Sequence, residues 1–334
     1  MSSDHDTCHC GHDHDHHHDH GAKHIYIYSP SSAVRDKAAF RRGVKRLQKL
    51  GYEVEIDVDA LSSHTRFAGD DATRLAAIHR AAASGADVAL ISRGGYGLTR
   101  ILPGIDYAAV ARAIDGGLRF VGVSDFTAFQ NAVLAQTGAV TWAGPALCPD
   151  FGTQELPDDI MEACFDDLIC GHGEGAGWRL PRAKPVTGAA PETPAAPVEF
   201  DIPAARLWGG NLAVLASLVG TPYLPQVPGG ILFIEDVNEH PYRVERLLTQ
   251  LLYAGVLAQQ QAVIFGQFTS YTLAAHDKGF KLQSVVDWLR RQITTPVLTQ
   301  LPYGHVETKV CLPVGAQVEL SVQGRDALLY WGHP

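Results

Sequence analysis

The sequence contains no long apolar run and no excess of basic residues. It has 27 lysines and arginines against 36 aspartates and glutamates, a formal net charge of −9 over 334 residues. A transmembrane helix needs roughly eighteen or more apolar residues in a row, and a secretory signal needs a basic start followed by an apolar stretch; we find neither pattern. A surface that binds nucleic acid needs clustered positive charge. We therefore expect a cytoplasmic protein that binds neither membranes nor nucleic acids.

Cysteine is also scarce, with six residues spread thinly along the chain. Such spacing does not match the dense cysteine framework of small secreted domains. Hydrophobic residues make up 46% of the chain, which is more than one core usually contains. We therefore expect two domains behind a polar N-terminal segment.

Histidine, in contrast, is concentrated at the N-terminus, where residues 1–23 form a low-complexity tract of His and Asp. The tract is too polar to pack into a core, and we expect a disordered tail. Thiolate and imidazole groups bind zinc, nickel and copper, so the tract predicts a divalent-metal site outside catalysis; a solvated tail without metal is the alternative. The candidate ligands are Cys8, His9, Cys10, His12, His14, His16, His17, His18 and His20.

From residue 24 onward, β-rich runs alternate with helical patterns. The runs 24–30 and 52–58 flank a helical segment that opens with serines and ends at Gly51, and a second helix over 70–85 precedes another buried strand. This alternation predicts an N-terminal α/β domain over residues 24–170 with a doubly wound, mostly parallel sheet. Ligands of such folds bind where strands end, and the segments "SRGGYG" and "GVSD" both follow strands.

Residues 171–206 are rich in Gly, Pro and Ala, which predicts a linker between two domains. Residues 207–334 are expected to form a smaller C-terminal α/β domain with short strands. There, "GGILFIEDVNEHPY" is typical of a buried strand that ends in acidic residues, and "RVERLLTQLLYAG" is typical of an amphipathic helix.

The segment "FVGVSDFTAF" places Ser124 between an apolar strand and a helix. A serine on such a turn exposes its hydroxyl, and the backbone N–H of the next residue, Asp125, then lies beside the carbonyl that the serine attacks. The nucleophile motif G-x-S-x-G is half met, because Gly122 fills the first glycine position and Phe126 replaces the second glycine. The alternative interpretation of Ser124 is a plain helix N-cap.

A serine nucleophile needs a base and an orienting acid, and the second domain offers candidates for both. His305, in "LPYGHVETK", follows a strand and a Tyr-Gly turn, and His240 in "NEHPY" is its rival. Glu235 ends the strand "GGILFIED"; a buried carboxylate needs a partner, and an imidazole N–H is a suitable one. Asp236 and Glu239 are the competing acids.

Five motifs in chain order resemble the LD-carboxypeptidase family, serine peptidases of murein recycling. They are "SRGGYGLTRILPGIDY", "GVSDFTAFQNAVL", "LWGGNLAVLASLVGTPYLP", "GGILFIEDVNEHPYRVERLLTQL" and "LPYGH", and the resemblance runs from about residue 24 to the C-terminus. It implies a triad divided between the domains, with Ser124 as nucleophile, Glu235 as acid and His305 as base. The His/Asp tail and the proline-rich linker depart from the family pattern.

The resemblance implies a carboxypeptidase that removes the terminal D-Ala of the cytoplasmic murein tetrapeptide through an acyl-enzyme. It implies no cofactor for catalysis, and it suggests a homodimer. Backbone N–H groups of Asp125 and of Gly94 or Gly95 are expected to bind the oxyanion. Arg93 is the candidate for binding the free carboxylate of the substrate, with a structural salt bridge as the alternative.

Two other functions stay open at this point. One is a serine peptidase that resembles the microcin immunity peptidases and acts on peptidyl or aminoacyl nucleotides. The other is a metal-binding protein that uses the His/Asp tail on an inactive hydrolase scaffold.

Overall fold

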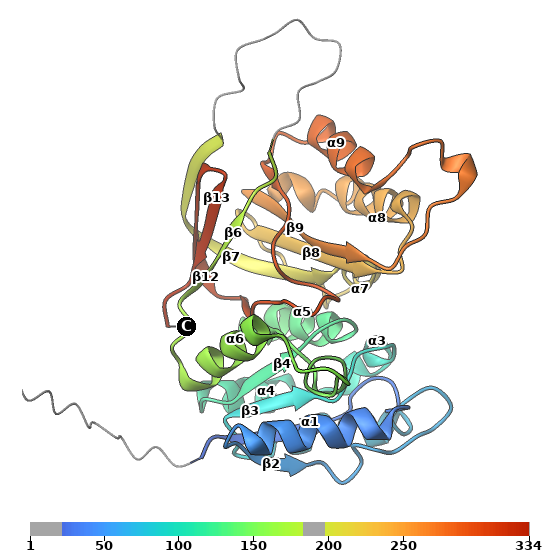
Figure 1. Ribbon diagram of the computed structural model, residues 1–334, viewed down its shortest axis with the longest axis vertical. Helices are drawn as coiled ribbons and strands as arrows, with labels where there is room; N and C mark the ends of the chain where they lie inside the picture. The colour runs from blue at the N-terminus through green and yellow to red at the C-terminus, as the bar shows by residue number, and fades with distance from the viewer. Residues whose placement is uncertain (1–21, 183–197, 334) are drawn as a thin grey trace, which may run out of the picture.

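The computed structural model describes residues 22–182 and 198–333, which form two sheets flanked by helices (Figure 1). The two sheets lie one above the other in this view, and helix α5 (Phe126–Thr137) lies between them. The tail ligands predicted from the sequence, Cys8 to His20, lie outside the described residues. Across the part of the chain that the structure describes, no helix has the length and apolarity to span a bilayer.

The first sheet has six strands in the order β11-β5-β4-β3-β1-β2. Five of them run parallel, and β11 pairs antiparallel with β5 at one edge. The doubly wound, mostly parallel sheet predicted from the alternating pattern is confirmed. Its strands are β1 (His24–Tyr28), β2 (Glu53–Ile56), β3 (Val88–Ile91), β4 (Arg119–Gly122), β5 (Thr141–Ala143) and β11 (Leu312–Val314).

Helices pack against this sheet and bury its central strands, so that every residue of β3 is buried. Helix α1 illustrates the sequence pattern: Asp36 caps its first turn by accepting from Ala39 N, and Phe40, Val44 and Leu47 form its buried face. The helices of this domain are α1 (Lys37–Lys49), α2 (Asp71–Ala83), α3 (Leu98–Ile101), α4 (Tyr107–Asp115), α5 and α6 (Asp159–Cys170).

The second sheet is mixed, with seven strands in the order β10-β9-β8-β7-β12-β13-β6. The long strand β7 joins its parallel half to its antiparallel half, because it pairs with β8 at one end and with β12 at the other. The strands are β6 (Gly175–Arg179), β7 (Val198–Asn211), β8 (Ile231–Val237), β9 (Ala262–Thr269), β10 (Val297–Leu298), β12 (Gln317–Gly324) and β13 (Asp326–Tyr330); the helices are α7 (Leu212–Ser217), α8 (Pro241–Tyr253) and α9 (Leu282–Gln292).

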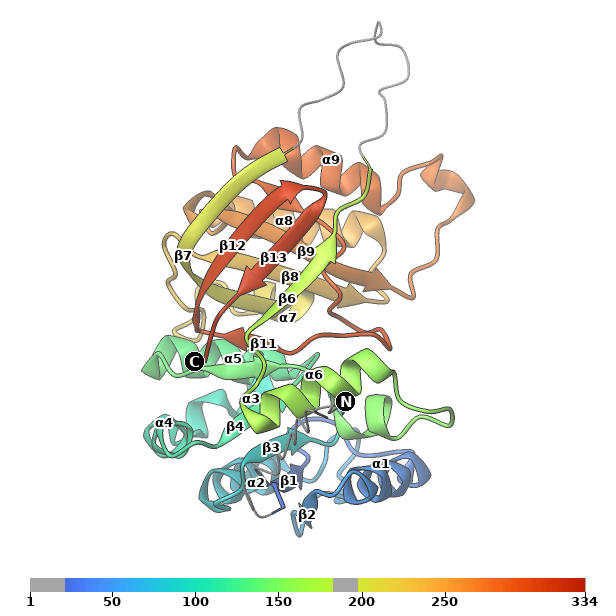
Figure 2. The same cartoon turned by 60° about the vertical axis from the view of Figure 1, so that its left-hand side comes forward.

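The residues expected to link the domains, 171–206, supply β6 and the first part of β7 to the second sheet. Figure 2 shows these strands side by side with β12 and β13. In β6, the buried side chains of Ala176 and Trp178 alternate with exposed neighbours, which is the period of a strand. Two of those neighbours are glycines, so the composition resembles that of a loop although the alternation is that of a strand.

Helix α5 joins the two sheets through direct hydrogen bonds. The Asn211 N–H donates to Thr127 Oγ1 at 2.9 Å, and Asn131 Nδ2 donates to Gly209 O at 2.8 Å. Gly210 permits this close approach, because its φ is 128° and a Cβ there would lie 2.5 Å from Thr127 Oγ1. The end of β7 is therefore held against the first turn of α5.

Candidate active site

Ser124 lies on the turn between β4 and α5 in a left-handed conformation, with φ of 69°. Residues other than glycine adopt this conformation rarely, and those that do cluster at functional sites. The N-cap of α5 is Asp125, whose side chain forms no cap hydrogen bond. Ser124 is therefore not the N-cap of this helix.

The glycine loop that follows β3 lies directly against Ser124. A Cβ at Gly94 would lie 2.5 Å from Ser124 Cβ and 2.8 Å from its Oγ, so only glycine permits this contact. Within the described residues, the backbone N–H groups of Gly94, Gly95 and Asp125 donate no hydrogen bond. An oxyanion site requires backbone N–H groups that are free to donate.

Glu235 and His305 form a hydrogen-bonded pair in the second domain. Glu235, on β8, is fully buried, and its Oε2 lies 2.7 Å from His305 Nδ1. Burial alone would lower the pKa of His305, but the hydrogen bond from the imidazole to Glu235 and the charge of that carboxylate outweigh burial and raise the pKa above its ordinary value. A carboxylate at Nδ1 favours the tautomer that leaves Nε2 as the basic nitrogen.

Asn211 connects this pair with helix α5. Its backbone N–H bonds to Thr127, as described above, and its side-chain Nδ2 donates to Glu235 Oε1 at 3.2 Å and to Asp236 Oδ1 at 3.0 Å. Sequence reasoning missed this residue. Its signal is the asparagine at the end of "LWGGN", but spacing alone does not show which carboxylates it faces.

Neighbours of each half of the candidate site bond to the π-helical turn Leu147–Phe151. Cys148 N donates to Ser92 O at 2.9 Å, which places this turn at the end of β3, beside the glycine loop. Lys309, four residues after His305, reaches the same turn from the second domain, where its Nζ donates to Asp150 Oδ1 at 2.6 Å. Sequence reasoning also missed this buried pair.

Family models match both halves of the chain. The model of the LD-carboxypeptidase N-terminal domain matches residues 25–144, and that of the LD-carboxypeptidase C-terminal domain matches residues 204–320. The crystal structure of muramoyltetrapeptide carboxypeptidase from Oxalobacter formigenes is 36% identical to this chain with a TM-score of 0.81, and the match covers 93% of this chain and 99% of that one. The protein belongs to the LD-carboxypeptidase family.

Curated relatives of this LD-carboxypeptidase include a peptidase and an immunity protein. The "probable murein peptide carboxypeptidase" of Bacillus subtilis is 28% identical over 86% of this chain and 85% of its own length. The microcin C7 self-immunity protein of Escherichia coli is 26% identical over 90% of this chain and 91% of its own length. Family membership makes this protein a serine-type carboxypeptidase.

The competing residues of this LD-carboxypeptidase make other contacts. Burial, and next the charge of neighbouring Glu235, raise the pKa of Asp236 to about 6. Glu239 forms an ion pair with the arginine four residues later. His240 caps α8, and its Nε2 lies 3.0 Å from Asp277 Oδ2. Among these acids and histidines, the structure pairs Glu235 with His305.

Arg93 lies in the glycine loop and is half-buried. Its Nη1 donates to Ala33 O at 3.3 Å, and within residues 22–182 and 198–333 it forms no ion pair. The structural salt bridge considered as its alternative is therefore not observed in this part of the chain. Within those residues, its other guanidinium nitrogens donate no hydrogen bond.

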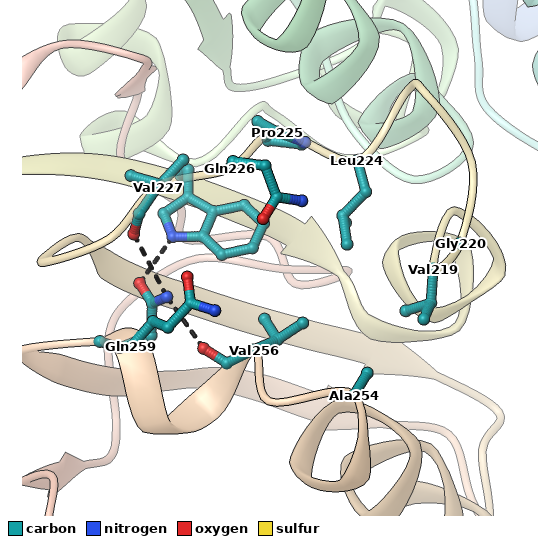
Figure 3. A pocket seen from close by; sticks show the side chains of 11 residues that line it. Val219, Gly220, Leu224, Pro225, Gln226, Val227, Ala254, Val256 and Gln259 are labelled. Carbon is teal, nitrogen blue, oxygen red and sulfur yellow. Dashed lines mark hydrogen bonds between the residues drawn. The ribbon is translucent and has the colours of Figure 1, made fainter.

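A cavity of about 120 Å³ lies in the second domain, apart from these residues (Figure 3). Trp208, Leu224 and Val256 are among its lining residues, which include none of the predicted site residues. Among the described residues, no group of three or more His, Cys, Asp or Glu side chains is placed to hold a metal ion.

Proposed function

We propose that this serine carboxypeptidase removes the terminal D-Ala from the murein tetrapeptide in cytoplasmic peptidoglycan recycling. The observation that supports the proposal is the 2.7 Å hydrogen bond between His305 Nδ1 and the buried carboxylate of Glu235. The glycine loop that lies against Ser124 supports it as well. The names of the relatives from Bacillus subtilis and Oxalobacter formigenes support the substrate class.

In the proposed acylation step, Ser124 Oγ attacks the carbonyl carbon of the bond before D-Ala. His305 Nε2 takes the hydroxyl proton, while Glu235 stabilises the imidazolium that forms. The carbonyl oxygen becomes an oxyanion, which accepts hydrogen bonds from Asp125 N–H and from Gly94 or Gly95 N–H. His305 then returns the proton to the leaving amine, and D-Ala departs with its own carboxylate.

Deacylation repeats these steps with water as the nucleophile. His305 takes a proton from the water, the hydroxide attacks the acyl carbon, and the proton passes to Ser124 Oγ as the ester bond breaks. The shortened peptide leaves with a new carboxylate, and the serine is restored. No redox or metal step enters this scheme, and Arg93 is the proposed partner of the D-Ala carboxylate.

Purified tetrapeptide and four variants test this proposal. Ser124→Ala and His305→Ala should each lower kcat for D-Ala release by roughly 10⁴-fold or more, and the double variant should be little worse, because members of a triad act as a unit. His240→Ala, which removes the rival histidine, is the matched control and should keep kcat within a few-fold. Near-normal D-Ala release by Ser124→Ala would remove the proposed mechanism.

The likeness to the microcin C7 self-immunity protein supports a second candidate substrate class, peptidyl or aminoacyl nucleotides. The same serine, histidine and acid would act on either substrate, so active-site variants do not separate the two functions. A direct comparison of kcat/KM for the tetrapeptide and for an aminoacyl sulfamoyl nucleoside separates them.

We also propose a homodimer, which sedimentation of the purified chain tests.

A further inference from the structure

Two buried charged side chains beneath the glycine loop are not used by the proposed triad. Asp125 is 2% exposed and Arg74 is 0% exposed. Asp125 directly follows the proposed nucleophile, whereas Arg74 lies on α2, some fifty residues earlier in the chain. Burying a charged group is costly unless hydrogen bonds or an opposite charge compensate, so the contacts of these side chains indicate what they do.

The Asp125 carboxylate binds two loops with one oxygen. Its Oδ2 accepts from Ser31 Oγ at 2.8 Å and from Leu98 N at 2.9 Å. Ser31 lies in the loop after β1, and Leu98 begins α3 at the end of the glycine loop. The residue that offers its backbone N–H to the oxyanion therefore also holds, through its side chain, the loop that offers the second N–H.

Arg74 binds the same two loops through its guanidinium group. Its Nη1 donates to Gly97 O at 2.8 Å and to Pro30 O at 3.2 Å. Asp71 pairs with its Nη2, and the guanidinium lies 4.8 Å from the centre of the Phe67 ring. A Cβ at Gly97 would lie 2.6 Å from Arg74 Nη1, so the loop backbone rests directly on this guanidinium.

The two side chains thus hold adjacent residues of the same loops: Asp125 binds Ser31 and Leu98, and Arg74 binds Pro30 and Gly97. We propose that Asp125 and Arg74 are positioning residues that hold the glycine loop 93–98, and with it the second oxyanion donor, against Ser124. This inference rests on the proposed serine mechanism.

A loop of this composition needs support from buried side chains. It contains three glycines between Arg93 and Leu98, and glycine loses more conformational freedom on ordering than any other residue. An oxyanion donor acts only within a narrow range of distance, and removing one such donor typically lowers kcat by about 10²–10³-fold. Loss of the loop's support should therefore weaken transition-state stabilisation more than substrate binding.

The test compares Asp125→Ala with Asp125→Asn. The alanine removes both loop contacts, whereas asparagine keeps one acceptor oxygen where Oδ2 now accepts both bonds. The readouts are kcat and KM for D-Ala release and the rate at which a small fluorophosphonate labels Ser124, since that adduct also needs the oxyanion donors. We expect Asp125→Ala to lower both rates by about 10²-fold with KM changed only a few-fold, and Asp125→Asn to restore most of the loss.

Asp57 and Arg80 provide matched controls in the same domain. Asp57 is 3% exposed and accepts from Tyr26 at 2.6 Å, and Arg80 lies on α2 and pairs with Asp57 at 2.7 Å. No hydrogen bond or ion pair joins either side chain to residues 93–98. Asp57→Ala and Arg80→Met should also lower the melting temperature but keep the labelling rate within a few-fold. Labelling by Asp125→Ala at the rate of Asp57→Ala, below both melting temperatures, would overturn the inference.

If Asp125→Ala does not fold, Arg74→Met and Arg80→Met replace Asp125→Ala and Asp57→Ala in the comparison. Arg74→Met should be labelled about 10²-fold more slowly than Arg80→Met, and equal labelling rates would overturn the inference.

The fluorophosphonate also separates this inference from the proposed function. If the wild-type protein is labelled but releases no D-Ala, the proposed substrate is wrong, and the role of Asp125 and Arg74 is still decided by the labelling rates.

Discussion

Lys309 and Asp150 form a buried ion pair across the domain interface, with 2.6 Å between Nζ and Oδ1 and side-chain exposures of 3% and 4%. Asp150 also accepts from Ala146 N at 2.7 Å, so it orders the turn that lies beside the glycine loop. Burial raises the pKa of Asp150, and the charge of Lys309 opposes that rise. Because Lys309 follows His305 by four residues, this pair fixes the base-bearing segment on the first domain.

Lys309→Met should lower the free energy of unfolding by about 3–5 kcal/mol at neutral pH, because it leaves a buried carboxylate without its cation. The pKa of Asp150 then rises further in the folded state, while in the unfolded chain it stays near 3.9, roughly its reference value. The folded variant therefore binds more protons, and its stability falls as pH rises from about 4 toward the raised pKa. Denaturant unfolding at several pH values measures this slope.

A partly exposed ion pair provides the control for this variant. Lys23 Nζ lies 3.1 Å from Asp87 Oδ1, and both side chains are about one-third exposed. Lys23→Met should cost less than about 1 kcal/mol. If Lys309→Met costs no more than Lys23→Met, or if its stability does not change between pH 4 and 8, the buried pair does not stabilise the folded protein.

The pH dependence of turnover should follow His305. The neutral imidazole is the base, and Glu235 raises its pKa, so the acidic limb of kcat/KM should lie above about 6.5, the ordinary value for histidine. Glu235→Gln removes the charge that raises the pKa and leaves burial, which lowers it. We therefore expect a slower enzyme whose acidic limb has moved to lower pH.

Glu239→Gln is the control for this shift, because that carboxylate pairs with Arg243 and not with the imidazole. Its profile should match that of the wild type. An acidic limb that stays in place in Glu235→Gln would mean that another group titrates, and Asp236, with its pKa raised to about 6, would be the next one to replace.

Local sequence signals predicted the first domain well. Apolar residues repeat with the period of a strand or of a helix within each element from β1 to β3. The parallel sheet could therefore be predicted from residues close together in the chain. The turn at Ser124 was also recognisable, because a serine follows a buried strand. Glu235 and His305 were singled out from several acids and histidines only through the family resemblance.

Contacts between residues distant in the chain were not predictable in this way. Asp150 and Lys309 are 159 positions apart, and Arg74 reaches a loop that begins with Arg93, so no spacing reveals either contact. Strand β11 has three residues and pairs with the first sheet although its chain neighbours belong to the second. Three residues are too few to predict which strand they pair with, because that pairing depends on how the two domains are arranged.

The His/Asp tail separates the enzyme from a metal-binding protein. The predicted ligands between Cys8 and His20 lie outside the described residues, and their number makes divalent-metal binding at neutral pH the chemical expectation, since imidazoles are then largely unprotonated. Serine acyl transfer needs no metal. Deleting residues 1–22 should therefore abolish most zinc or nickel binding, measured by calorimetry, and leave kcat, KM and the melting temperature nearly unchanged.

A full-length variant with Asn for the tail histidines and Ser for its cysteines should behave in the same way, and chelator should spare D-Ala release by the wild type. Loss of D-Ala release in proportion to metal removed would mean that metal takes part in catalysis, and the mechanism based on Ser124 would then have to be abandoned.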